Sequence, residues 1–476
     1  MPLSNRFLLL GVCALALAGC KTVGPDFHTP GGPTGSGYAM AGDPVAAGVR
    51  LDPDARTLGP WWQAFGSPEL DQTVRTALTD SPTIAEANAT LQRYQAQARA
   101  ARGAELPQVD ATAGAQRERI NTQAFGFTGF PSPTINLYSI GATVSYDLDL
   151  FGGKRRATEA AQARAEAAAR QADAAYLTLT GNVATQAMRV AGLRAQIVAM
   201  EAVVADDQRT IEMVRAAERA GGEAPSAATG ATAQLAEDEA AIPPLQRQLA
   251  EARHQLALLS GKAPAEWTAP DFDLARFTAP AEVPVSLPST LVRKRPDILA
   301  AEAELHEATA RVGVAVANQY PDIRLSANLT QSAIKPEKLF DYSASGWNIL
   351  AGVTAPIFHG GTLRAQRKAA EAEARASLAR YQQTVLRAFT QVSDVLAALA
   401  TDDTRMAALA KAQATAEASV GDAEAAYRLG GGPLIDVVDA RRGLSRTRRA
   451  LAEAQAQRFG DMVELYAATA ADWRGV

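Results

Sequence analysis

Side chains that could carry out chemistry are few in this 476-residue chain, and their spacing does not suit catalysis. Gly153-Lys154 and Gly261-Lys262 lack the flanking residues of a phosphate-binding loop. No serine or cysteine nucleophile motif is present. The four histidines are scattered without metal-ligand spacing: His28, His254, His306 and His359. The sequence therefore predicts no enzyme, no metal site and no cofactor.

The stretch AYRLGGGPLIDVVDA, residues 426–440, is the most informative polar constellation. Its consecutive glycines allow a sharp backbone turn. Two carboxylates, Asp436 and Asp439, follow the turn closely. From residue types alone, these acids charge the start of a helix, where they interact favourably with the helix dipole.

The bulk composition bounds the class of protein. The chain is 47% hydrophobic and 21% charged, with a net charge of -4. No basic face stands out, which argues against a nucleic-acid partner.

The first residues, MPLSNRFLLLGVCALALAGC, are typical of an export signal, predicted at 1–19. The ending Leu-Ala-Gly-Cys resembles the bacterial lipobox, in which Cys20 is acylated and becomes the new amino terminus; the alternative is an unprocessed signal with an incidental cysteine. By the same resemblance, Lys21 after the cysteine favours sorting to the outer membrane. Residues 20–60 are predicted to be a lipid anchor and tether. Cys13 would leave with the signal, so no disulfide is expected.

Four segments alternate apolar and polar residues: about 108–117, 137–150, 322–330 and 346–358. A period of two places the apolar set on one face of a strand. For one strand alone, a sheet of a soluble protein that packs its apolar face on a hydrophobic core is the ordinary explanation of this pattern. No later run of 18 apolar residues is free of charge, so any membrane crossing must use the strands. Four strands in lipid would leave unpaired edges, and several chains must then build the sheet together.

The chain is also an internal repeat. Pro82 and Pro107 recur as Pro296 and Pro321, 214 residues later, and the glycines at 221–222 recur at 430–431. Repeat 1 is predicted at 61–262, with a long helix at 154–219 and a shorter one at 225–259. A proline-rich linker follows at 263–288. Repeat 2 is predicted at 289–476, with helices at 362–429 and 433–470. Each long helix would measure about 100 Å.

Several stretches carry a family resemblance: LAGCKTVGPDFHTP, WWQAFGSPELDQTV, RPDILAAEAELHEATARVGVAVANQYPDIRLSA and YRLGGGPLIDVVDARRGL. They resemble the outer-membrane factor family, the TolC-like exit ducts of bacterial tripartite pumps, in the lipoprotein form called NodT-like. The resemblance implies a mainly α fold with a transmembrane β part and two tandem repeats, each with two strands and long plus short helices. It also implies a homotrimer, with a 12-stranded β-barrel continued by a periplasmic α-helical barrel.

The resemblance assigns roles to residues and partners. A lipid-facing set is implied in the strands: Tyr138, Ile140, Val144, Tyr146, Leu148 and Trp347. Tyr427, Asp436 and Asp439 would form a periplasmic gate. Gly432 stands where the family has a pore-lining arginine; Arg428 would replace that arginine, or else the gate would be locked more weakly. The tips would dock a periplasmic adaptor (membrane fusion protein) through Gly221, Gly222, Gly430, Gly431 and Gly432. An RND-type inner-membrane transporter would complete the pump.

The function expected is therefore passive conduction of drugs or other small solutes across the outer membrane. A type I secretion channel that passes polypeptides is an alternative. A lipid-anchored periplasmic coiled-coil scaffold without a pore is another, although a scaffold would not need four amphipathic strands.

Overall fold

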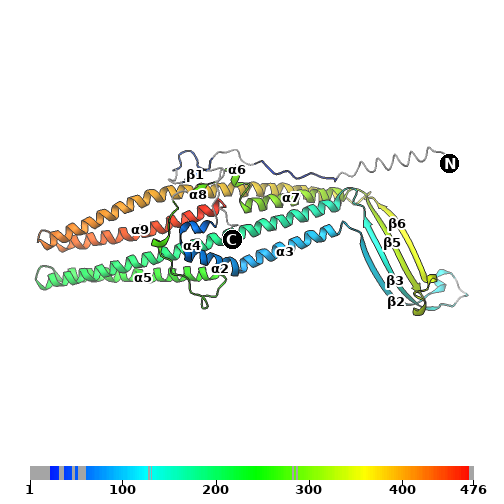
Figure 1. Ribbon diagram of the computed structural model, residues 1–476, viewed down its shortest axis with the longest axis horizontal. Coiled ribbons are helices and arrows are strands. Elements are labelled where there is room, and N and C mark those ends of the chain that lie inside the picture. Colours follow the sequence, from blue (N-terminus) through cyan, green and yellow to red (C-terminus); the bar gives the residue numbers. More distant parts are fainter. Residues whose placement is uncertain are drawn as a thin grey trace. The chain divides into compact units, whose positions relative to one another are not determined.

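The computed structural model describes residues 22–31, 37–44, 49–51, 60–126, 129, 131–280, 283–285 and 288–470 (Figure 1). These residues fall into two compact units. The first unit draws on Met1–Pro30, Thr90–Ala168 and Ala300–Tyr381. The second draws on Gly31–Ala89, Ala169–Leu299 and Gln382–Val476. The predicted signal at 1–19 and Cys20 lie outside the described residues.

The same order of elements occurs twice. The first copy consists of α3 (Pro82–Gly103), β2 (Gln108–Arg119), β3 (Thr134–Asp147), α4 (Gly153–Arg219) and α5 (Pro225–Leu259). The second consists of α7 (Pro296–Ala317), β5 (Asp322–Ala333), β6 (Ser345–Thr354), α8 (Thr362–Arg428) and α9 (Leu434–Ala468). The predicted fold class is therefore confirmed: two tandem repeats, each with two strands and long plus short helices. Both long helices have 67 residues and contain no proline.

Shorter elements surround these repeats. The second unit holds the short parallel pair β1 (Val49–Leu51) and β4 (Val283–Val285), the helices α2 (Pro68–Asp80) and α6 (Pro288–Leu291), and the 3-10 turns η1 (Trp61–Phe65) and η3 (Leu274–Arg276). The first unit holds η2 (Thr122–Phe125), η4 (Pro336–Lys338) and η5 (Tyr342–Ala344). No helix in the described part of the chain is long and apolar enough to cross a membrane.

The first unit contains an antiparallel sheet in the order β2-β3-β5-β6. Strand β3 ends at Asp147, earlier than the predicted 150, because Asp149 has a φ of 39° and accepts the backbone N–H groups of Lys154 and Arg155. Strand β6 ends at Thr354 rather than 358, since Pro356 has no N–H to donate to a ladder.

The N-terminal segment of the first unit is held against its helices. The Val23 N–H donates to the Phe151 carbonyl at 3.1 Å. Arg156, only 4% exposed at its side chain, pairs with Asp26 at 2.6 Å and donates to the Val23 carbonyl. Phe27 stacks on His306 with 4.4 Å between ring centroids. These contacts fix residues 22–27 beside the start of α4.

The core of the second unit is aromatic. Trp61, Trp62 and Phe65 are buried, and Trp61 stacks on Tyr466 of α9 at 5.5 Å. The helix α2 that follows is capped by Ser67, whose hydroxyl accepts the Leu70 N–H.

Arg295, at the start of the RPDI stretch, ties three helices of the second unit together. Its guanidinium donates to the Gln391 side chain of α8 at 3.1 Å and to the Ala468 carbonyl at the end of α9 at 3.0 Å. It also pairs with Asp297 of α7 at 2.8 Å. Arginine suits this position because its planar fork donates in several fixed directions.

Candidate functional site

Two equivalent glycine turns close the helical hairpins of the second unit. In the α4–α5 turn, Gly221 has a φ of 75° and Gly222 donates its N–H to the Ala217 carbonyl at 2.9 Å. In the α8–α9 turn, Gly430 has a φ of 73° and Gly431 donates to the Ala426 carbonyl, also at 2.9 Å. Each arrangement is a Schellman motif, whose left-handed position favours glycine.

Tyr427, in the last turn of α8, contacts residues of two other helices. Its half-buried ring packs against a small cluster that joins α4 to α9, formed by Val214, Leu434 and Val437. The predicted gate tyrosine therefore lies where the long helix of one repeat meets the return helix of the other.

The two predicted gate carboxylates are both exposed on α9. Asp436 lies in the first turn, and Asp439 pairs with Arg442 at 3.6 Å. Arg428, expected to replace the missing arginine, donates instead to the Glu424 carbonyl of its own helix at 3.3 Å. The structure thus brings Asp439 to Arg442 rather than to Arg428.

Gly432 is closely approached by α8. A Cβ at this position would lie 3.2 Å from the Ala426 Cβ, which is tight for a carbon contact. Any larger residue here, the arginine of the family pattern included, requires Ala426 to move.

Arg441 is the main polar link between the hairpins near the turn. Its Nη2 lies 2.7 Å from Glu424 Oε1 on α8, and its Nη1 reaches the Asp206 carbonyl and the Thr210 hydroxyl of α4, both at 3.5 Å. The side chain is only 16% exposed, so the pair is partly shielded from solvent. Sequence reasoning missed Arg441 and Arg442, although the arginines in DARRGL lie within one helical turn of Asp439.

In the first unit, the register of the sheet joins the apolar sets of all four strands on one face. Val109 faces Val144, Tyr146 faces Leu325, and Leu329 faces Trp347. Directly opposed residues of an antiparallel pair share a face. The opposite face carries the polar pairs Thr143 with Asn328, Ser145 with Ser326, and Asp147 with Arg324.

The apolar face is open to the surroundings within the single chain. Trp347, Ile349 and Val109 are 76%, 77% and 69% exposed. Ile140 and Val144 are exposed, Tyr138 and Tyr146 are half-buried, and Leu148 lies one residue beyond β3. Such an apolar, uncovered surface is unusual in a soluble monomer.

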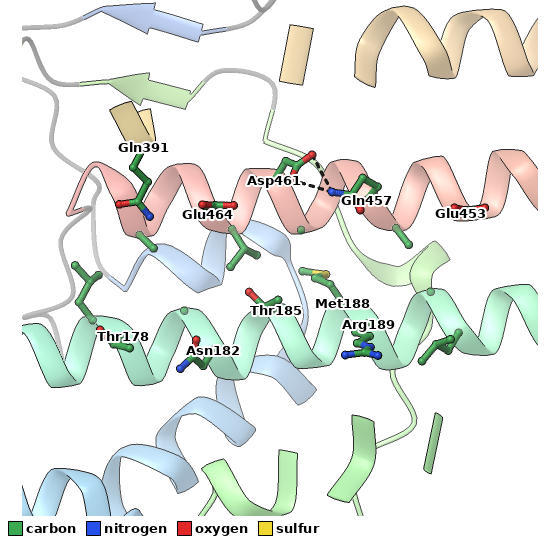
Figure 2. A pocket seen from close by; sticks show the side chains of 18 of the residues that line it. Thr178, Asn182, Thr185, Met188, Arg189, Gln391, Glu453, Gln457, Asp461 and Glu464 are labelled. Carbon is green, nitrogen blue, oxygen red and sulfur yellow. Dashed lines mark hydrogen bonds between the residues drawn. The ribbon is translucent and has the colours of Figure 1, made fainter. Parts of the chain in front are cut away.

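A cavity of about 850 Å³, with a mixed polar and apolar wall, lies between α4 and α9 in the second unit (Figure 2). Small residues let the helices approach, and a Cβ at Gly192 would overlap the Ala456 side chain. The labelled wall residues are mostly polar: Thr178, Asn182, Thr185, Met188, Arg189, Gln391, Glu453, Gln457, Asp461 and Glu464.

No group of three or more metal-ligating side chains occurs within the described residues. In the first unit, His306 is engaged by Glu159 at 3.0 Å and by the ring of Phe27.

Comparison with known proteins places this geometry in context. The family model described as outer membrane efflux protein matches residues 73–262 and 287–471. The chain is 29% identical over 474 residues to the pyoverdine export outer membrane protein OpmQ of Pseudomonas putida, covering 98% of each chain. It is 29% identical to the toluene efflux pump outer membrane protein TtgC of Pseudomonas putida, covering 99% of this chain and 96% of that one. The solved structure of the outer-membrane channel OprN matches with a TM-score of 0.86 and 26% identity, over 95% of this chain and all of OprN.

Proposed function

Because the chain belongs to the outer membrane efflux protein family, we propose that three copies of it form the exit duct of a tripartite efflux pump. The duct would conduct small solutes passively from a periplasmic adaptor and an RND-type inner-membrane transporter to the outside. Lipids of both leaflets of the outer membrane would surround its four-stranded β part.

The observation that carries this proposal is the four-stranded sheet with one apolar face and two open edges. Within the described residues, β2 pairs only with β3, and β6 pairs only with β5. Backbone groups on an open edge cannot stay unpaired in lipid. Closure by β2 of the next copy against β6 satisfies both edges, and three copies supply the twelve strands of a barrel wide enough for a lumen.

In this assembly the apolar set Tyr138, Ile140, Val144, Tyr146, Leu148 and Trp347 faces lipid. The polar pairs on the other face, such as Thr143 with Asn328, line a hydrated lumen. The aromatic Trp347 suits a membrane interface.

The turn of α8–α9 forms the periplasmic gate of the duct. Three copies of Asp436 and Asp439 would converge at the mouth and favour cations. Asp436 carries the larger effect, because Asp439 already pairs with Arg442.

The tips of the hairpins dock the adaptor. Gly221, Gly222, Gly430 and Gly431 are exposed, and Leu429 beside them is 85% exposed. An exposed leucine next to backbone groups of a glycine turn offers both apolar contact and hydrogen bonds to a partner hairpin.

Acylation of Cys20 anchors each copy at the membrane end. The Val23 N–H donates a hydrogen bond to the carbonyl of Phe151, which lies four residues after the end of β3. The chain that follows Cys20 is therefore held close to the end of this strand. Replacing Cys20 by serine should remove the lipid, which the mass of the N-terminal peptide reports directly.

The relatives are named for export of pyoverdine and of toluene, which favours small solutes over polypeptides as cargo. Planar bilayers test conduction by the purified chain. Efflux-deficient cells that supply an adaptor and an RND-type pump test the pathway: restored resistance to small toxic solutes supports the proposal. A protein that never conducts, or one that restores only polypeptide secretion, would contradict it.

A further inference from the structure

Each helical hairpin of the second unit holds a pair of carboxyl groups between its long helix and its return helix. In the α4–α5 hairpin, Asp207 lies within hydrogen-bond reach of Asp238. In the α8–α9 hairpin, Asp402 lies within reach of Asp461. The sequence positions are not equivalent in the two repeats, so the pairs do not follow from the repeat itself.

The two pairs nevertheless have the same local surroundings. On the long helix, Asp207 Oδ2 and Asp402 Oδ2 are buried without a hydrogen-bond donor. On the return helix, the partner is held by a glutamine four residues earlier: Gln234 donates to Asp238 at 2.8 Å, and Gln457 donates to Asp461 at 3.1 Å.

Two ionised carboxylates so placed repel one another, whereas one proton between them makes a hydrogen bond that also satisfies the buried oxygen. Asp402 is only 7% exposed, which strengthens both effects. Burial, followed by the neighbouring Asp461, raises the pKa of Asp402 to about 7. Burial, followed by Asp238, raises the pKa of Asp207 to about 6.

The surrounding charges do not cancel this effect. Arg458 of α9 and Arg405 of α8 face Asp402, but Arg458 is engaged by Asp403 at 2.8 Å. Arg442 of α9 faces Asp207 and is also the partner of Asp439, while Asp206 adds a negative charge. Arg442 therefore interacts both with Asp207 and with Asp439, one of the two predicted gate carboxylates.

We propose that each hairpin is clamped by one shared proton, held between Asp207 and Asp238 in the first and between Asp402 and Asp461 in the second, so that each hairpin tightens in acid. The first clamp acts on the channel tip, because Asp207 faces Arg442, the partner of Asp439. Loss of either proton leaves two negative charges between packed helices and loosens that hairpin. The effect on the channel rests on the proposed function; the shared protons do not.

Infrared spectroscopy of the detergent-solubilised protein tests the shared protons directly, because a protonated carboxyl has its own C=O stretching band. The wild-type protein should lose two such protons between about pH 5 and about pH 8. Asp402→Asn should remove the later step and Asp207→Asn the earlier one. The matched controls Asp422→Asn on α8 and Glu212→Gln on α4 alter exposed carboxylates that do not act on either pair, and should leave both steps in place.

A wild-type protein with no protonated carboxyl above about pH 5.5 would overturn the proposal, whether or not the variants fold. Steps that survive in both Asp402→Asn and Asp207→Asn would do the same. In bilayers, wild-type conductance should fall on acidification, and Asp207→Asn should lose that response. Conductance independent of pH would refute tightening of the tip, whereas infrared steps in a protein that forms no channel would refute the proposed function and leave the shared protons standing.

Discussion

Arg441 of α9 and Glu424 of α8 form an ion pair of 2.7 Å, and the same guanidinium reaches the Asp206 carbonyl of α4. One side chain thus joins both long helices to a return helix, close to the turn that carries Asp436 and Asp439. In the proposed duct, these contacts would let Arg441 hold the mouth in a narrow state.

Replacing Arg441 by alanine should widen the mouth, because about 1 to 3 kcal/mol of charged hydrogen bonding is lost at a partly buried site. Single-channel conductance should rise several-fold. The exposed Arg446 on the same helix is the matched control, and Arg446→Ala should conduct like the wild-type protein. Restoration of low conductance by the exchanged pair Arg441→Glu with Glu424→Arg would identify the pair itself as the restraint; an unchanged Arg441→Ala channel would exclude it.

Asp436→Asn should weaken cation preference more than Asp439→Asn, since Arg442 already offsets the Asp439 charge. The reversal potential in a salt gradient measures this preference. Asp422→Asn, on the exposed surface of α8, controls for a general change of surface charge. Equal selectivity in all three variants would remove these carboxylates from the conduction path.

Gly192→Ala should destabilise the packing of α4 against α9 by about 1 to 3 kcal/mol, because the added methyl overlaps the Ala456 side chain. Ala456→Gly should relieve the overlap in the double variant. A Cβ added at Gly421 of α8 would meet no atom within 4 Å outside its own helix backbone. Gly421→Ala should therefore stabilise its helix by about 1 kcal/mol. Thermal unfolding compares the variants, and a Gly192→Ala protein as stable as the wild type would show that the helices are not in close contact.

Asp402→Asn should stabilise the protein in a pH-dependent way. The pKa of Asp402 is raised from 3.8 to about 7, so the folded state holds its proton more tightly than the unfolded state does. The contribution of Asp402 to the free energy of unfolding is therefore complete below about pH 4 and is lost as the pH rises through about 7. The asparagine variant cannot ionise, and its unfolding temperature should exceed that of the wild type at pH 8 and match it near pH 4. A constant difference across this range would contradict the assignment.

Much of the fold was accessible from the sequence because its signals are local and repeated. The proline-free stretches after Gly153 and Gly361 predict long helices, and the double glycines predict their turns. The strict alternation around Tyr138 predicts an amphipathic strand. The family and an outer-membrane efflux function are confirmed by the comparisons, and the fold class is confirmed by the order of elements in the structure.

Features that depend on register between helices could not be foreseen. The approach of Asp402 to Asp461 and the reach of Arg441 to Glu424 follow from how far each helix is rotated, which periodicity does not fix. The three-residue strands β1 and β4 are too short to show any pattern. Helix α2 was missed although Ser67, Pro68 and Glu69 form a recognisable helix start.

The native mass of the mature protein in mild detergent, corrected for bound detergent, tests the central claim most directly. A mass close to three chains is predicted, because only closure between copies pairs the free edges of β2 and β6. A stable monomer that keeps its strand signal would contradict the shared barrel, and with it the duct.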